Sequence, residues 1–362
     1  MEIFNTNPAK ATFETIASPF LSSEVIRFGT DNLFPNHTRN IVLHSITGQS
    51  CFNTLSRFLN GTGWQQYGDV AVNEEETLND LLKQAAESLA LYNGFAILCY
   101  FNALGGVYDM EVLDFTKVRR KNRDIDSTFL YKDWTKFASA DNNETLEFEN
   151  FNYRTSNKGA ALLYVNSSNS DIYPFPSYFA AFDAMRTEAK CGKVALSLSK
   201  NKFSIQAIVE LKTKFATALR AGEEFANSQQ GRKIQGVVNT MQDALSNDNE
   251  GQYIAVVTDK EDEGVVIHPM ENKQQIIDLT QTASYAAEDI HRAFNQDKIL
   301  ANTALAAGFS TDDIINSYKK YNFLTESNRQ VIERAFVKIV SDSSFAKNIK
   351  SDTLKIEPLQ WI

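Results

Sequence analysis

The residues that could do chemistry are few, and their spacing matches no catalytic motif. His37 and His44 lie seven residues apart on one predicted helix, but two ligands on one face do not define a metal site. His291 lies beside Glu288 on a later predicted helix, where we expect an interface or surface residue rather than a general base. The chain contains no HExxH, no P-loop, no GxGxxG and no GxSxG. We therefore predict no catalytic residue, no metal and no cofactor.

Two runs of charge could act through electrostatics instead. Five positive side chains fall within seven residues after a predicted strand: Lys117, Arg119, Arg120, Lys121 and Arg123. This basic patch is either a solvated loop or a contact for phosphate groups. Residues 241–263 carry seven acids: Asp243, Asp248, Glu250, Asp259, Glu261, Asp262 and Glu263. This acidic run is a solubilising surface, a docking face for a basic partner, or a wall that repels DNA.

Length and composition limit the class of protein. The chain has 362 residues, of which 43% are hydrophobic, so we expect a globular protein with one large domain or a few smaller ones. Its net charge of −9 argues against a protein that grips nucleic acid tightly. The three cysteines, Cys51, Cys99 and Cys191, are far apart, which favours buried free thiols in a reducing compartment. We expect neither a signal peptide nor a membrane span.

Periodicity and capping residues predict the elements that must position these residues. We expect a mixture of helices and strands, with Asn73 and Glu76 as the capping box of the second helix, and Thr311 and Thr325 as the N-caps of the last two. The predicted helices are 35–59, a helix after Asn73 that ends at Asn93, 177–199, 213–227, 271–295, 312–322 and 326–341. The predicted strands are 95–101 and 108–112 as a hairpin, 146–148 and 160–165 in antiparallel sheet, 203–211, 234–238, 253–257, 264–268 and a terminal strand at 354–358.

The clearest periodicity is an apolar seam along the helix predicted at 271–295. Its members are spaced 3, 4, 3, 4 and 3 residues apart: Ile276, Leu279, Ala283, Ala286, Ile290 and Ala293. Heptad spacing of this kind is typical of a helix packed along another helix, and the three alanines allow a partner to approach closely. A plain buried helix in a bundle would produce the same stripe.

Six segments, in their order along the chain, resemble the portal proteins of tailed bacteriophages. They are Phe28-Gly29-Thr30-Asp31-Asn32-Leu33-Phe34-Pro35, Asn60-Gly61-Thr62-Gly63-Trp64, Leu91-Tyr92-Asn93-Gly94-Phe95-Ala96, Ile172-Tyr173-Pro174-Phe175-Pro176-Ser177-Tyr178, Asn201-Lys202-Phe203-Ser204 and Ala287-Glu288-Asp289-Ile290-His291-Arg292-Ala293-Phe294. The chain departs from the family pattern where Asn295-Gln296-Asp297-Lys298 replaces the usual proline after Ala-Phe. The region after residue 341 is also short, which implies a reduced crown.

The resemblance implies an α+β fold. It would be a portal-like ring subunit with an α/β wing, two long stem helices flanking a small α/β clip, and C-terminal helices. The implied segments are 1–27 as an N-terminal arm, 28–175 as the wing, 176–202 as the first stem helix, 203–270 as the clip, 271–296 as the second stem helix, 297–310 as a tunnel-loop-like segment, and 311–362 as C-terminal wing or reduced-crown helices with a terminal strand.

The resemblance also implies a function without catalysis. The family forms a homo-oligomeric ring of about twelve subunits at one capsid vertex, through which double-stranded DNA passes during packaging and ejection. The implied partners are DNA bound non-specifically, the terminase large subunit, head-completion or adaptor proteins and the major capsid protein, with no membrane. The implied location is the virion, and the host cytoplasm during assembly.

The resemblance further implies roles for particular residues. The seam would be a subunit interface between stem helices, and the acidic run would lie near the motor-docking end. The residues that would face the channel and touch DNA weakly are Gln296, Lys298, Asn302 and Thr303.

Two other functions remain open at this point. One is a metal-dependent nuclease that uses a carboxylate pair together with the basic patch at 117–123. The other is a different phage head or neck protein with mixed α/β wings. For a portal, the acidic net charge is consistent with DNA contact that is transient, non-specific and free of base readout.

Overall fold

The structure is a computed structural model of the whole chain, and its two compact units are described separately. It describes residues 20–21, 25–121, 128–135, 145–151, 159–168, 172–200, 207–213, 254–259, 264–269, 273–300, 311–341 and 354–360. Unit 1 comprises Met1–Arg186 and Ala287–Ile362, and unit 2 comprises Thr187–Ala286. The boundary between the units therefore lies within two helices, α5 (Phe182–Lys200) and α7 (Lys273–Ala293).

The first predicted helix is two helices, α2 (Phe34–His44) and α3 (Ile46–Asn60). The expectation of one continuous helix was wrong because Ser45 has extended backbone angles, with φ −102° and ψ 122°. Its side chain accepts a hydrogen bond from the backbone N–H of Gly48 and so caps α3. Ser45 therefore separates two helices within a stretch whose apolar pattern is continuous.

Helix α4 (Leu78–Tyr92) forms the centre of unit 1, as its apolar stripe predicted. Its buried residues include all six predicted positions: Leu78, Leu81, Leu82, Ala85, Ala86 and Leu89. The capping box was misplaced, because Thr77 and Asp80 form it rather than Asn73 and Glu76. Asn73 instead accepts a hydrogen bond from the Glu76 N–H at 2.7 Å in the turn before the helix.

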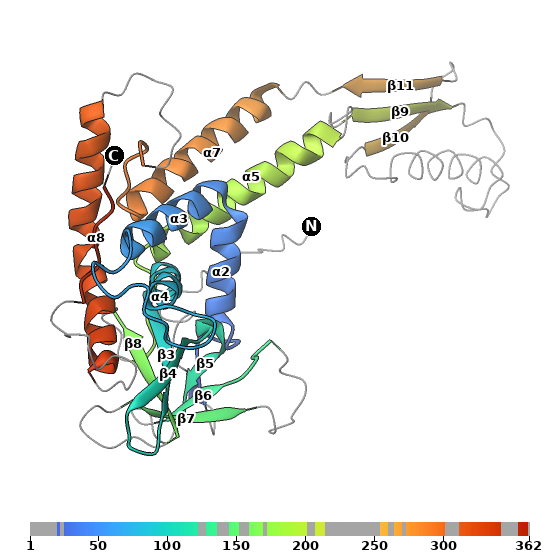
Figure 1. The fold of residues 1–362 in the computed structure, drawn as a ribbon. Coiled ribbons are helices and arrows are strands. Elements are labelled where there is room, and N and C mark those ends of the chain that lie inside the picture. Colours follow the sequence, from blue (N-terminus) through green and yellow to red (C-terminus); the bar gives the residue numbers. More distant parts are fainter. Residues whose placement is uncertain are drawn as a thin grey trace. The chain divides into compact units, whose positions relative to one another are not determined.

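A mixed sheet packs against α4 in unit 1 (Figure 1). Its strand order is β4 (Val107–Val112), β3 (Gly94–Phe101), β8 (Ala160–Asn166), β7 (Leu146–Asn150), β6 (Thr128–Tyr131) and β5 (Val118–Arg120). The β3–β4 hairpin was predicted correctly. The rest is not wholly antiparallel, because β7 runs parallel to β8. A short ladder of β1 (Phe20–Leu21) and β2 (Ile26–Arg27) precedes α2.

The two predicted C-terminal helices are one helix, α8 (Thr311–Val340). Thr325 is not an N-cap. It is buried, and its hydroxyl donates to the Tyr321 carbonyl at 2.8 Å within the helix. The predicted terminal strand is reduced to a single bridge between Ile356 and Trp64. The buried Glu333 on α8 accepts the Ile356 N–H at 2.9 Å, which anchors the end of the chain to this helix.

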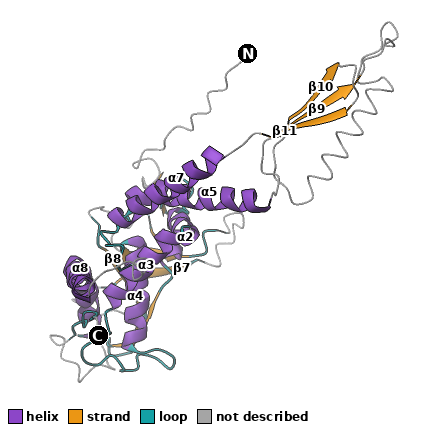
Figure 2. Cartoon of the chain, turned by 90° about the horizontal axis from the view of Figure 1, so that it is seen from above, coloured by secondary structure: helices purple, strands orange, loops and turns teal. Residues whose placement is uncertain are grey.

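Unit 2 contains a three-stranded sheet together with parts of α5 and α7 (Figure 2). The central strand β9 (Ala207–Thr213) pairs in parallel with β10 (Ile254–Asp259) and antiparallel with β11 (Gly264–Pro269). These strands lie within a few residues of those predicted at 203–211, 253–257 and 264–268. The helix predicted at 213–227 and the strand predicted at 234–238 lie outside the described residues.

The α+β fold class predicted from the sequence is confirmed by these elements. Within the described residues, no helix is both long and apolar enough to cross a membrane. Cys51 and Cys99 are buried free thiols, as expected, whereas Cys191 is partly exposed.

Candidate functional site

The segment that directly follows α7, in unit 1, contains Gln296 and Lys298, two of the residues that were predicted to meet DNA. The helix is ended by Asn295, whose left-handed φ of 52° reverses the chain. The Asn295 N–H donates to the Arg292 carbonyl and the Gln296 N–H donates to the His291 carbonyl, both at 3.0 Å. These two bonds form a Schellman motif, which satisfies the last carbonyls of the helix. The motif directs Gln296 inward.

Gln296 is buried in the core of unit 1. Its side-chain amide donates to the Cys51 carbonyl on α3 and to the Tyr321 hydroxyl on α8, both at 2.7 Å. This burial disagrees with the expected contact between Gln296 and DNA. The residue instead joins the end of α7 to two helices that are distant in sequence.

His291 is also buried, contrary to the expected surface or interface position. Its Nδ1 atom lies 3.4 Å from the Cys51 sulfur. His37 and His44, the pair considered as metal ligands, have different partners. His37 pairs with Asp31 at 2.6 Å, and the Nδ1 atom of His44 lies 2.7 Å from the Asn40 carbonyl oxygen. Across the part of the chain that the structure describes, no group of three or more metal-binding side chains gathers.

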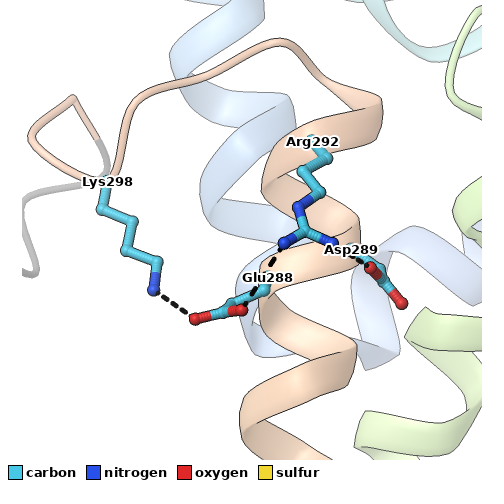
Figure 3. A network of polar contacts seen from close by, with 4 residues as sticks. All are labelled: Glu288, Asp289, Arg292 and Lys298. Atoms are coloured by element: carbon cyan, nitrogen blue, oxygen red, sulfur yellow. Dashed lines mark hydrogen bonds and ion pairs between the residues drawn. The ribbon is translucent and has the colours of Figure 1, made fainter.

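The exposed side of the same helix end carries a network of ion pairs (Figure 3). Glu288 accepts a hydrogen bond from the Lys298 ammonium at 2.9 Å and lies 3.9 Å from Arg292. Arg292 also pairs with Asp289 at 3.2 Å. The Lys298 ammonium holds the pKa of the Glu288 carboxyl below its usual value, with Arg292 contributing less. Each cation of this network is thus matched by a carboxylate.

A further ion pair joins Asp297, in the segment after α7, to Lys320 on α8. Asp297 accepts from the Lys320 ammonium at 3.1 Å, and the Ser317 hydroxyl donates to it at 3.4 Å. The two pairs border an open hollow of about 750 Å³ at the end of α7. The ion pairs at this helix end join three cations, Arg292, Lys298 and Lys320, to three carboxylates, Glu288, Asp289 and Asp297. A polyanion that approaches these cations must therefore compete with the carboxylates. Asn302 and Thr303 lie outside the described residues.

The seam predicted along α7 lies on the less exposed face of that helix. Ala286 and Ile290 are buried, whereas Leu279, Ala283 and Ala293 are partly exposed. Ile276 lies in the helix, but its side chain is outside the described part. Leu279, Ala283 and Ala293 are therefore only partly buried by their own chain.

Most of the basic patch is held against the six-stranded sheet of unit 1. Arg119 is fully buried, donates to the side chain and the carbonyl of Asn32 at 2.6 Å each, and lies over the rings of Phe28 and Trp134. Burial lowers the pKa of its guanidinium to about 10. It therefore cannot belong to a solvated patch.

The other cations of the patch also have partners close by. Lys121 pairs with Glu147 at 2.8 Å, the Arg120 guanidinium lies 5.0 Å from the Tyr164 ring centre, and Lys117 lies over the Tyr131 ring. Arg123 lies outside the described residues, as does the whole acidic run apart from the backbone of Asp259 and its neighbours in β10.

Comparison with known proteins by sequence yields no family: no family model matches the chain, and no curated protein matches it. Comparison of the structure does yield neighbours. A chain from the neck of a native gene transfer agent particle, computed with C12 symmetry, superposes with a TM-score of 0.54 at 11% identity, over 90% of this chain and 84% of that chain. A chain from the neck of the empty particle, computed with C6 symmetry, gives 0.52 at 12% identity, over 90% and 85%.

The structural neighbours also include a phage portal protein. The crystal structure of an HK97 family phage portal protein from Corynebacterium diphtheriae aligns at 14% identity over 83% of this chain and 90% of that chain. The two chains superpose with a TM-score of 0.42. The two gene transfer agent chains, in contrast, show that this chain has the α+β fold of a component of those necks.

Proposed function

We propose that this protein is a portal, one subunit of a ring through which double-stranded DNA is packaged into a particle and leaves it. The shared fold with the neck chains, over 90% of this chain, carries the proposal. Those necks were computed with C12 and C6 symmetry, which supports a cyclic homo-oligomer of about twelve copies here. The role is structural rather than catalytic.

The two helices that flank the unit 2 sheet are the proposed stem. In a ring, the partly exposed seam residues of α7 pack against a neighbouring copy, and the small side chain of Ala283 permits close approach. Val194 and Leu196 on α5 are exposed in the single chain as well. Exposed apolar residues on both proposed stem helices support contacts between copies, because large apolar side chains in water favour burial.

The balanced charge at the end of α7 supports passage of DNA without tight binding. Phosphate affinity depends on how many unpaired cations displace counterions, and the cations Lys298 and Arg292 are each engaged by carboxylates. The net charge of −9 acts in the same direction. Asn302 and Thr303, within the tunnel-loop-like segment 297–310, remain the proposed weak contacts to the DNA.

The proposed partners follow from this placement. Unit 2 is the proposed clip, where the acidic run at 241–263 would meet the terminase large subunit through basic residues of that partner. Head-completion or adaptor proteins would later replace the motor, and the major capsid protein would surround the wing. The proposed location is the vertex of the virion, after assembly in the host cytoplasm.

The proposal is tested by the mass and shape of the purified full-length protein. Native mass spectrometry and electron microscopy, over a range of salt and protein concentrations, should show a closed ring many times heavier than the 40.7 kDa chain. Compact monomers or dimers at every concentration would overturn the proposal. Plasmid DNA incubated with the protein and magnesium or manganese should remain intact. Cleavage that co-purifies with the protein would favour the nuclease reading instead.

A further inference from the structure

Helix α8 presents a large apolar residue on the face that points away from its own core. The buried side of the helix includes Ile314, Tyr321 and Ile332, whereas Phe323 is 77% exposed. Its neighbour Leu324 is exposed as well. A phenylalanine in this position costs free energy in a lone subunit, since its ring remains in water. We call Phe323 and Leu324 the α8 knob.

An apolar groove lies elsewhere in unit 1. It has a volume of about 380 Å³ and runs between α2, α3, α4 and the segment after β4. Its buried floor includes Leu91 and Phe115, and its walls include the partly buried Phe52 and the exposed Leu43. A groove of this size and lining suits one or two large apolar side chains. We call it the α2–α4 groove.

The knob and the groove lie on opposite sides of one helical layer within unit 1. Helices α3 and α4 each pack against both α2 and α8, and both views show α3 and α4 between them (Figures 1 and 2). The knob of a chain therefore cannot enter the groove of the same chain. A cyclic ring needs this arrangement, because a head-to-tail contact joins two different surfaces on opposite sides of each copy.

The charges beside the two surfaces are complementary. On α8, Lys319 lies one turn before Phe323 and Glu326 lies one turn after it, on the same face. The groove has Arg39 on its α2 wall and Glu87 on its α4 wall. All four side chains are exposed, and none forms an ion pair with another residue in the described ranges. Each surface thus offers one cation and one anion beside its apolar centre.

From these observations we infer that the α8 knob of one copy inserts into the α2–α4 groove of the next copy around the ring. The contact pairs Glu326 with Arg39 and Lys319 with Glu87 across the junction. This inference rests on the proposed ring but goes beyond it, because it assigns the two faces of the wing that meet. The occupant of the groove is a second copy of this chain.

Disulfide trapping tests the contact directly. In a Cys191→Ser background, the pair Phe323→Cys and Leu43→Cys should give a ladder of covalent dimers and higher oligomers on a non-reducing gel after mild oxidation. The matched control is Phe323→Cys with Leu104→Cys, at a hairpin turn where Leu104 is 96% exposed. If rings form but the amount of covalent oligomer is no greater than in this control, the inference is overturned. A disulfide confined to single chains would overturn it too.

A charge exchange tests the predicted pairing independently of cysteines. Glu326→Arg or Arg39→Glu alone should weaken ring association by roughly tenfold or more, and the double variant should restore most of it. Equal losses in the double and single variants would contradict the pairing. Failure of the proposed function can be told apart from failure of this inference. A wild-type chain that forms no ring would contradict both. If the wild type forms rings, and Phe323→Glu forms them as readily as Leu104→Glu does, only the proposed contact is contradicted.

Discussion

The ring of Tyr178 stacks on the ring of Phe294, with the centroids 4.2 Å apart and the planes 15° from parallel. Tyr178 lies just before α5, and Phe294 directly follows α7. The Tyr178 hydroxyl also donates to the Leu91 carbonyl near the end of α4, at 2.7 Å. One aromatic pair therefore holds together the entry to the first proposed stem helix and the exit from the second.

Removal of this aromatic pair should destabilise unit 1. Phe294→Ala should lower the free energy of unfolding by about 3–5 kcal/mol, because it removes a buried ring and leaves a cavity. Tyr178→Phe keeps the stack but leaves the Leu91 carbonyl unpaired, so a loss of about 1–3 kcal/mol is expected. Urea unfolding followed by circular dichroism measures both. Leu104→Ala is the control, with a change within about 0.5 kcal/mol. Similar stability of Phe294→Ala and this control would contradict the packing role.

Gln296 and Lys298, two residues apart, should respond differently to substitution. Gln296→Leu should cost about 1–3 kcal/mol of folding free energy, because the Cys51 carbonyl and the Tyr321 hydroxyl lose their buried donor. Lys298→Ala removes an exposed ion pair and should cost at most about 1 kcal/mol. Thermal or urea unfolding of the two variants compares them. A Gln296→Leu variant that is as stable as the wild type would contradict a structural role for the buried hydrogen bonds of Gln296.

The seam of α7 offers a comparison between adjacent residues. Ala286 is 5% exposed and Tyr285 is 66% exposed. Ala286→Glu should destabilise the subunit or its ring by several kcal/mol, on the order of 3, because it buries a carboxylate without a partner. Tyr285→Glu introduces the same charge one position earlier and should have a much smaller effect on subunit unfolding. An unchanged melting temperature and an intact ring for Ala286→Glu would contradict the tight packing of the seam at Ala286.

Buried tyrosines should make the protein sensitive to alkali. Burial raises the pKa of Tyr173 to about 12, from 10.0, although Arg119 acts in the opposite direction. A raised pKa means that the folded state keeps a proton which the unfolded state releases above pH 10, so stability is present below pH 10 and falls as pH rises toward 12. Each such tyrosine contributes a slope of up to about 1.4 kcal/mol per pH unit.

Tyr173→Phe isolates this contribution. At pH 8 the variant should be less stable by about 1–2 kcal/mol, since the Tyr173 hydroxyl donates to Ile26 and accepts from the Arg120 N–H. Urea unfolding between pH 8 and 11.5 should then show the wild type losing stability faster than the variant, so that the difference shrinks. Parallel pH profiles would contradict the assignment.

Local patterns predicted much of the fold, and they failed where distant residues override local preference. The stripe of α4 was correct because 3.6-residue periodicity reports directly which face of a helix is buried. Thr325 was misread as a helix start because threonine is favoured at N-caps. In the structure the buried Arg329 donates to the carbonyls of Phe58 and Asn322 and to the Thr325 hydroxyl, and these bonds keep α8 continuous through that position.

The candidate site shows the same limit. The basic run at 117–123 has the composition of a solvated loop, yet Arg119 is buried against Asn32, a residue 87 positions earlier. Gln296 was predicted to face DNA, yet it bonds to Cys51, 245 positions earlier. No local pattern signals such pairs. For the Tyr178–Phe294 stack the sequence did give a signal, because both residues lie in segments that resemble portal proteins.

By itself, the sequence determined the α+β class, the order and approximate extent of most elements, and the seam face of α7. These properties depend on neighbours within one or two turns along the chain, so periodicity and capping residues report them. Tertiary structure alone decided which side chains are exposed to water: the polar residues Arg119, His291 and Gln296 are buried, whereas the apolar Phe323 is exposed. The reason is that burial depends on contacts between segments far apart in sequence, and those contacts form only when the whole of unit 1 has packed.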